Sequence, residues 1–257
     1  MYDGREYIVD PSGTYTFAHY YFHPDQGRRV VLTGTCHVAD AIFYEQIRKI
    51  LSPCDLVLSE HFTLGQVQRH ERIAWIKEQI FSVSIEDAFY SAVMYGPTGL
   101  AYMLGLCDEN DALQNEYSLP HWVNVDLLVS ARSKIRETYD EDLKERWRDI
   151  SILVKERIVA YFRDVIERIA RDDFRKSELQ EAERLTDGDE FEVPVKEILV
   201  FPRDASCFVE FDRLVEERRP EFVGIKFGCG HTKSQRSLLE ARGYVYEKSI
   251  RLQAIAF

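Results

Sequence analysis

Two short apolar runs, separated by a helical pattern, constrain the fold of this chain more than any other feature. Val30–Leu32 and Leu56–Leu58 are each too short for a helix, and each is followed by small or polar residues. Between them, apolar residues recur at helical spacing over residues 42–51, and the pattern stops before Pro53. A strand, a helix and a strand in this order form a βαβ unit, which predicts parallel strands joined by a right-handed crossover.

Segments near both ends of the chain extend this sheet. The first thirty residues alternate in the manner of strands around turns at residues 10–13 and 23–27, which predicts an N-terminal β-hairpin. Phe222–Phe227 is typical of a buried strand, residues 234–242 of a helix, and Gly243 of its left-handed C-cap. We therefore expect an α/β fold with a mostly parallel central sheet and flanking helices.

The first middle segment, Phe62–Leu106, has a helical pattern rich in aromatic residues. The uncharged stretch Ala88–Cys107 within it is long enough to cross a bilayer, but it contains three glycines and a proline. Two buried helices broken at residues 95–98 explain this composition better than a membrane span. Val123–Asp126 is predicted as a further short strand.

A second middle segment carries one long apolar stripe. From Ile135 to Ile169, apolar residues recur at spacings of three and four with charges between them, which predicts one very long helix or two in line. We interpret it as a helical insertion at about 128–185 that packs on the sheet of a single domain spanning 1–257. A dimerisation arm that forms a homodimer is the alternative.

Charge and cysteine usage exclude several classes of protein. With 33 basic and 44 acidic residues, the net charge of −11 argues against a nucleic acid as the main partner. The five cysteines form no CxxC pair, which argues against a disulfide framework and against a zinc ribbon. The N-terminus lacks the apolar run of a secretory signal, so we expect a cytoplasmic protein without a membrane span.

Two Gly-x-x-His motifs, Gly34–His37 and Gly228–His231, each follow an apolar strand and precede a helix. Ligands of open parallel sheets bind at the carboxyl ends of the strands, where we expect both histidines to lie. Glu60 directly follows the second apolar run and is expected at the same edge. Two imidazoles and a carboxylate can hold a catalytic divalent metal and leave a position open for water.

The same residues allow less specific interpretations. His37 and His231 are also suited to capping helices or bonding to backbone in tight turns, with Glu60 at the surface. Cys36 lies beside His37 and Cys229 lies near His231, which raises the alternative of a thiol nucleophile. The glycines complete neither a dinucleotide fingerprint nor a P-loop, so nucleotide binding is weakly supported.

The motifs in combination resemble the TraB/PrgY family, which is grouped with the GumN and Tiki proteins and more distantly with ChaN and erythromycin esterase. Order and spacing match over residues 28–67 and 198–247. The motifs that carry the resemblance are Gly34-Thr-Cys-His37, Pro53-x-Asp55-x-Val57-x-x-Glu60, Arg203-Asp204, Gly228-x-x-His231, Leu238-Leu239 and Gly243-Tyr244. The resemblance implies an α/β fold in which the motifs meet at one site. For the Tiki members it also implies a metal-dependent protease activity that uses both histidines and the glutamate.

These observations lead to the hypothesis of a metal-dependent hydrolase acting on peptide or amide bonds. His37 and His231 would hold Mn²⁺, Co²⁺ or Zn²⁺, and Glu60 would be the third ligand or the general base. Arg203 would bind a substrate carboxylate or stabilise an oxyanion. The alternatives are a non-catalytic protein that binds haem, a metal or a peptide in the same crevice, and an interaction module that uses the long helical segment.

Overall fold

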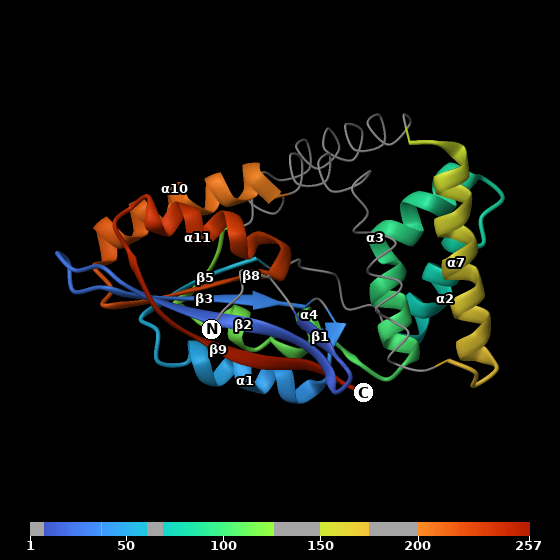
Figure 1. The fold of residues 1–257 in the computed structure, drawn as a ribbon, viewed down its shortest axis with the longest axis horizontal. Helices are drawn as coiled ribbons and strands as arrows, with labels where there is room; N and C mark the ends of the chain where they lie inside the picture. Colours follow the sequence, from blue (N-terminus) through green and yellow to red (C-terminus); the bar gives the residue numbers. More distant parts are fainter. Residues whose placement is uncertain (1–7, 37, 61–68, 126–149, 175–199) are drawn as a thin grey trace.

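The computed structural model describes residues 8–36, 38–60, 69–125, 150–174 and 200–257, and its centre is a mixed sheet with helices on both faces (Figure 1). The predicted α/β class is confirmed. The strand order is β1-β2-β3-β8-β5-β7, and β9 pairs with β2 off this path, along residues 13–22. The strands are β1 (Ile8–Asp10), β2 (Gly13–Phe22), β3 (Arg29–Thr35), β5 (Leu56–Ser59), β7 (Trp122–Asn124), β8 (Phe222–Gly228) and β9 (Val245–Ala256).

The four strands from β3 to β7 are parallel, whereas β1, β2, β3 and β9 pair antiparallel and include the predicted N-terminal hairpin. The two apolar runs of the predicted βαβ unit are parallel strands joined by α1 (Ala41–Leu51), but β8 lies between them. All seven residues of β8 are buried. A strand that is apolar on both faces belongs at the centre of a covered parallel sheet, which explains this order.

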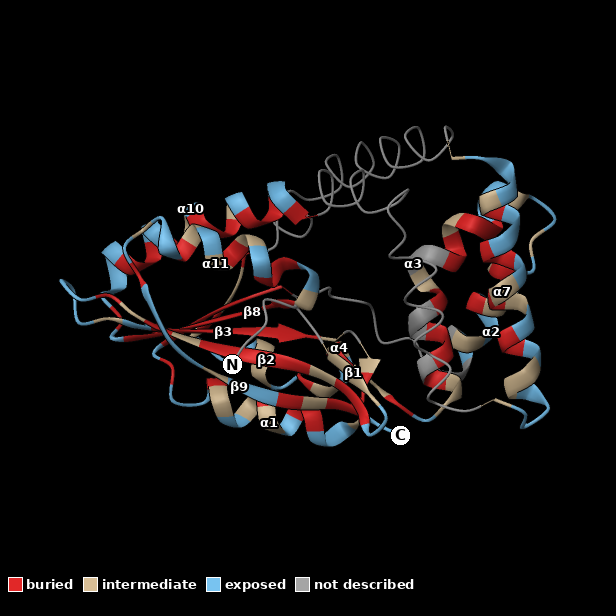
Figure 2. Ribbon diagram, in the orientation of Figure 1, coloured by how far each residue is buried: buried red, intermediate tan, exposed pale blue. Residues whose placement is uncertain are grey.

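Helices cover the two faces of the sheet and create two apolar cores (Figures 1 and 2). α1 packs on one face, and α10 (Phe201–Arg218) and α11 (Thr232–Glu240) lie on the other. Strand β8 serves both cores, because successive side chains of a strand point to opposite faces. Val223, Ile225 and Phe227 join the core under α10, and Phe222 joins the core over α1.

A third core belongs to a group of helices beside the sheet, α2 (Arg69–Ile80), α3 (Ile85–Met103) and α7 (Ile152–Ala170) (Figure 1). α7 lies within the predicted insertion at 128–185, and the rest of that insertion lies mostly outside the described residues. We expected the apolar stripe of the insertion on the sheet, but the part of the stripe that lies in α7 packs against α2 and α3. The apolar residues of the three helices form one shared core, which buries this part of the stripe away from the sheet.

The predicted break at residues 95–98 is wrong, because α3 continues from Ile85 to Met103. A proline inside a helix removes one hydrogen bond and costs about 3 kcal/mol. Close packing offsets this, since a Cβ at Gly96 would lie only 2.4 Å from the Phe162 ring of α7. In the part of the chain that the structure describes, no helix is long and apolar enough to cross a membrane.

Short elements complete the edge of the sheet at which ligands are expected. β4 (Val38–Ala39) and β6 (Cys107–Asp108) form a small antiparallel pair. α4 (Glu109–Ala112) and the 3-10 turn η1 (Glu116–Ser118) follow β6, and the 3-10 turn η4 (Cys229–His231) joins β8 to α11. Gly243 ends the C-terminal helical segment with a φ of 83°, as its predicted role as a left-handed cap requires.

Candidate functional site

The candidate site lies at the carboxyl ends of three neighbouring parallel strands, β3, β8 and β5. The register pairs Thr35 with Gly228 and Ser59 with Lys226, so the residues that follow these strands emerge side by side. Glu60 directly follows β5, and the turn that contains His231 directly follows β8. The structure therefore places Glu60 at the predicted edge beside that turn. His37 lies outside the described residues.

Both carboxylate oxygens of Glu60 are engaged. Glu60 is only 3 % exposed, and its Oε1 forms an ion pair with the guanidinium of Arg203. Its Oε2 accepts a hydrogen bond of 3.0 Å from the backbone N–H of Gly228. Arg203 is also buried and extends from the first turn of α10, so two predicted site residues from distant segments are in direct contact.

His231 completes this cluster from the turn η4. Its Nε2 lies 3.5 Å from Nη1 of Arg203, and its Nδ1 lies 2.8 Å from Oδ1 of Asp204. The Phe227 ring packs edge-on against the imidazole, with 5.3 Å between ring centroids. Glu60, Arg203, His231 and Asp204 thus form one connected, buried chain of charged and polar groups, named here the Glu60–Asp204 cluster.

Asp204 belongs to this cluster, although the sequence patterns assigned no role to this residue. It belongs to the quoted Arg203-Asp204 motif, but we assigned a site role only to the arginine. Its side chain is completely buried, and Gln235 of α11 donates a second hydrogen bond of 2.8 Å to the same Oδ1. The position of Asp204 directly after Arg203 was the available signal.

The first Gly-x-x-His motif needs its glycine for a steric reason. A Cβ at Gly34 would lie 2.8 Å from Oγ1 of Thr232 and 3.2 Å from Cα of Cys229. Only a residue without a side chain allows η4 and the start of α11 to lie this close to β3. The glycine thereby allows the turn that holds His231 to rest against the end of the neighbouring strand.

A second buried polar cluster, also missed at the sequence level, lies on the face of the sheet that α1 covers. Lys226 is completely buried, and its Nζ lies 2.7 Å from Oε1 of Glu109, 2.5 Å from the main-chain oxygen of Glu60 and 2.9 Å from Oη of Tyr117. Burial raises the pKa of Tyr117 well above its ordinary value, and the carboxylates of Glu109 and Glu60 add to the increase. Tyr117 is therefore a neutral hydroxyl that accepts a hydrogen bond from the ammonium.

The donor set can be compared with the requirements of a metal ion. Nδ1 of His231 contacts a carboxylate, which is the usual arrangement for a metal-binding histidine, but its Nε2 lies 3.5 Å from the guanidinium of Arg203. Glu60 fits less well, because Arg203 and the N–H of Gly228 already occupy its oxygens. Within the described ranges, no three His, Cys, Asp or Glu side chains are grouped as a metal site. Without His37, these residues do not form a metal centre.

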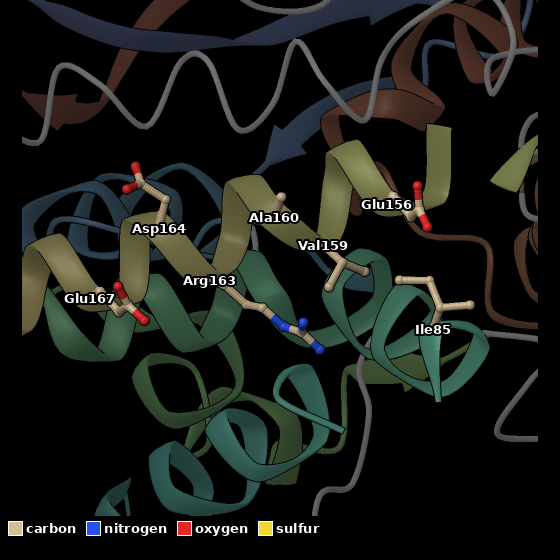
Figure 3. A pocket seen from close by; sticks show the side chains of 7 residues that line it. All are labelled: Ile85, Glu156, Val159, Ala160, Arg163, Asp164 and Glu167. Carbon is tan, nitrogen blue, oxygen red and sulfur yellow. The ribbon is translucent and has the colours of Figure 1, made fainter. Parts of the chain in front are cut away.

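An open pocket lies elsewhere, on the helices beside the sheet (Figure 3). It contains none of the predicted site residues; it is lined by Ile85, Glu156, Val159, Ala160, Arg163, Asp164 and Glu167. Arg163 has a structural role there, since it donates hydrogen bonds to the main-chain oxygens of Ile80, the last residue of α2, and of Ser82. The pocket is therefore separate from the chemistry that the sequence predicts.

No protein-family model matches this chain, and searches of curated proteins and of solved structures found no significant match. The fold and the Glu60–Asp204 cluster are thus the observations on which a function has to be based.

Proposed function

We propose that this chain is a metal-dependent hydrolase of peptide or amide bonds, in which Glu60, Arg203 and His231 act at one site. One observation carries the proposal. A carboxylate, a guanidinium and an imidazole from three distant segments are in contact and buried at the edge of the sheet where ligands bind. Buried ionisable groups that contact one another at such an edge are typical of active sites. The resemblance of the motifs to the TraB/PrgY family points to the same function.

Each residue of the site has a role that its contacts suggest. Nε2 of His231 would hold a divalent ion, Mn²⁺, Co²⁺ or Zn²⁺, together with His37 and Glu60. When bound, the ion supplies Lewis acidity and lowers the pKa of a water molecule. Arg203 orients Glu60, and the charge of its guanidinium suits a substrate carboxylate or a developing oxyanion.

The ion pair between Arg203 and Glu60 separates the two possible roles of the glutamate. If Glu60 is a metal ligand, the metal and Arg203 compete for the same carboxylate, and Arg203→Met binds metal at least as tightly as the unmodified chain. If Glu60 is the general base, Glu60→Gln keeps the metal while hydrolysis falls by about 10²- to 10⁴-fold.

The test combines metal analysis with a hydrolysis assay. The purified chain is incubated with Mn²⁺, Co²⁺ or Zn²⁺, its bound metal is measured by plasma mass spectrometry, and it is assayed on chromogenic peptide and amide substrates. We expect nearly one metal per chain and metal-dependent turnover, both lost in the double variant His37→Ala, His231→Ala. His121→Ala is the matched control, because His121 precedes β7 at the other end of β5 and should leave both unchanged.

Two outcomes would contradict the proposal. Metal binding without turnover on any substrate would indicate a non-catalytic binding protein, and a haem titration followed by absorbance would then test the alternative ligand. If neither the unmodified chain nor the double variant bound metal, His37 and His231 would be left as turn and capping residues.

A further inference from the structure

The strongest further observation concerns the two ring nitrogens of His231, which face groups of opposite hydrogen-bonding character. Nδ1 lies 2.8 Å from the carboxylate oxygen Oδ1 of Asp204, and an ionised carboxylate only accepts. Nε2 lies 3.5 Å from Nη1 of Arg203, and a guanidinium only donates. Both contacts therefore favour the same neutral tautomer, with the proton on Nδ1 and a lone pair on Nε2.

Asp204 is itself held in place by groups outside the proposed reacting set. Gln235 donates from Nε2 to the same carboxylate oxygen at 2.8 Å. It lies on α11, one helical turn after His231, which directly precedes this helix. Asp204 also lies in the first turn of α10, where the positive end of the helix dipole favours a negative charge. Among the described residues, its second oxygen, Oδ2, has no hydrogen-bond partner, so Oδ1 carries the described contacts.

We propose that Asp204 is a positioning residue, which fixes the Nδ1–H tautomer of His231 and directs the Nε2 lone pair toward Arg203. Gln235 supports it by orienting the carboxylate. The inference rests on the proposed function, since that function uses Nε2 of His231. A carboxylate behind a metal-binding or basic histidine sets its tautomer and orientation, and loss of such a partner typically lowers activity or metal affinity by about 10- to 100-fold.

The tautomer is measured directly by long-range ¹H–¹⁵N NMR on the full chain, labelled with ¹⁵N-histidine and freed of metal by a chelator. The signal of His231 is assigned by its absence from His231→Gln. We expect the Nδ1–H form to predominate in the unmodified chain at neutral and higher pH. In Asp204→Ala the acceptor at Nδ1 is gone and only the longer contact with Arg203 still favours the Nδ1–H form, so we expect the population of the Nε2–H form, which free histidine prefers, to rise.

A conservative variant and a control separate positioning from general stability. Asp204→Asn keeps an oxygen acceptor and is expected to retain the Nδ1–H tautomer. Asp212 lies on α10, as Asp204 does, and its exposed carboxylate pairs with Arg242. The control variant Asp212→Asn removes this carboxylate and should leave the tautomer of His231 unchanged. If Asp204→Ala fails to fold, Gln235→Leu provides the second test, with an expected partial loss of the Nδ1–H form.

The proposal is overturned if the unmodified chain carries the proton on Nε2, or if folded Asp204→Ala or Gln235→Leu shows the unmodified tautomer distribution. Because this readout needs neither metal nor substrate, a chain that fails to hydrolyse can still show the predicted tautomer. Failure of the proposed function and failure of this inference are therefore distinguishable. Where hydrolysis is found, a loss of about 10- to 100-fold in Asp204→Ala is expected.

Discussion

Replacing Lys226 by methionine should destabilise the fold strongly, because it leaves a buried negative charge without its partner. Lys226 and Glu109 are both almost fully buried, and they are paired at 2.7 Å. Removing one partner of a buried ion pair costs about 3 to 5 kcal/mol. The ammonium also donates to the main-chain oxygen of Glu60, and a buried acceptor that loses its donor costs about 1 to 3 kcal/mol.

We therefore expect Lys226→Met to lower the free energy of unfolding by about 4 kcal/mol, a large part of the roughly 5 to 15 kcal/mol of an ordinary domain. The double variant Lys226→Met, Glu109→Gln should recover more than half of this loss, because the uncompensated charge is gone. Urea unfolding followed by far-UV circular dichroism measures both values.

Lys155→Met is the matched control for this experiment. Lys155 is as buried as Lys226, but its partner Glu86 has a side chain that is 56 % exposed and becomes hydrated when the ammonium is removed. We expect the loss of this ion pair in Lys155→Met to lower the free energy of unfolding by only about 1 kcal/mol. The reasoning is refuted if the two lysine variants lose similar stability, or if the double variant is no more stable than Lys226→Met alone.

Two further predictions concern pH and packing. Burial lowers the pKa of His19 from 6.5 to about 4. The unfolded chain therefore binds a proton at this histidine more readily than the folded chain does. The free energy of unfolding should fall by up to roughly 3 kcal/mol as pH falls from 6.5 to 4. Urea unfolding at pH 7 and pH 4.5 measures this loss, which should shrink in His19→Gln; an equal loss in both chains would contradict it. Gly34→Ala should cost about 1 to 3 kcal/mol by overpacking against Thr232, whereas Gly230→Ala, where a Cβ would meet nothing within 4 Å, should be nearly neutral. Thermal unfolding compares the two alanine variants, and equal midpoints would contradict the steric argument.

The fold class could be predicted because short apolar runs report burial directly. Val30–Leu32, Leu56–Leu58 and Phe222–Phe227 are all strands of the central sheet. The order of these strands in the sheet could not be derived, because an apolar run shows that a strand is buried but not which strands pair with it. The continuity of α3 through Pro97 was missed for a related reason, because contacts with α7, distant in sequence, offset a local penalty.

The candidate site was partly predictable for the same physical reason. Glu60 and the turn before His231 follow strands that end at one edge, so the strand pattern alone places them there. Arg203 entered through the resemblance, whereas its contacts with Glu60 and His231 depend on how α10 packs. Lys226 was missed because a single lysine within an apolar strand gives no sequence signal for the carboxylate that pairs with it.

The first turn of α10 connects the two halves of the candidate site. Arg203 and Asp204 are adjacent in sequence, and successive helical residues point about 100° apart, so one helix end can contact two different groups. Arg203 contacts Glu60 after β5, whereas Asp204 contacts His231 after β8. The backbone N–H of Gly228, at the end of β8, also donates a hydrogen bond to the carboxylate of Glu60, which links the ends of β8 and β5. The glutamate and the histidine are thus held by a shared helix end and a shared strand end, and a displacement of α10 changes the surroundings of both.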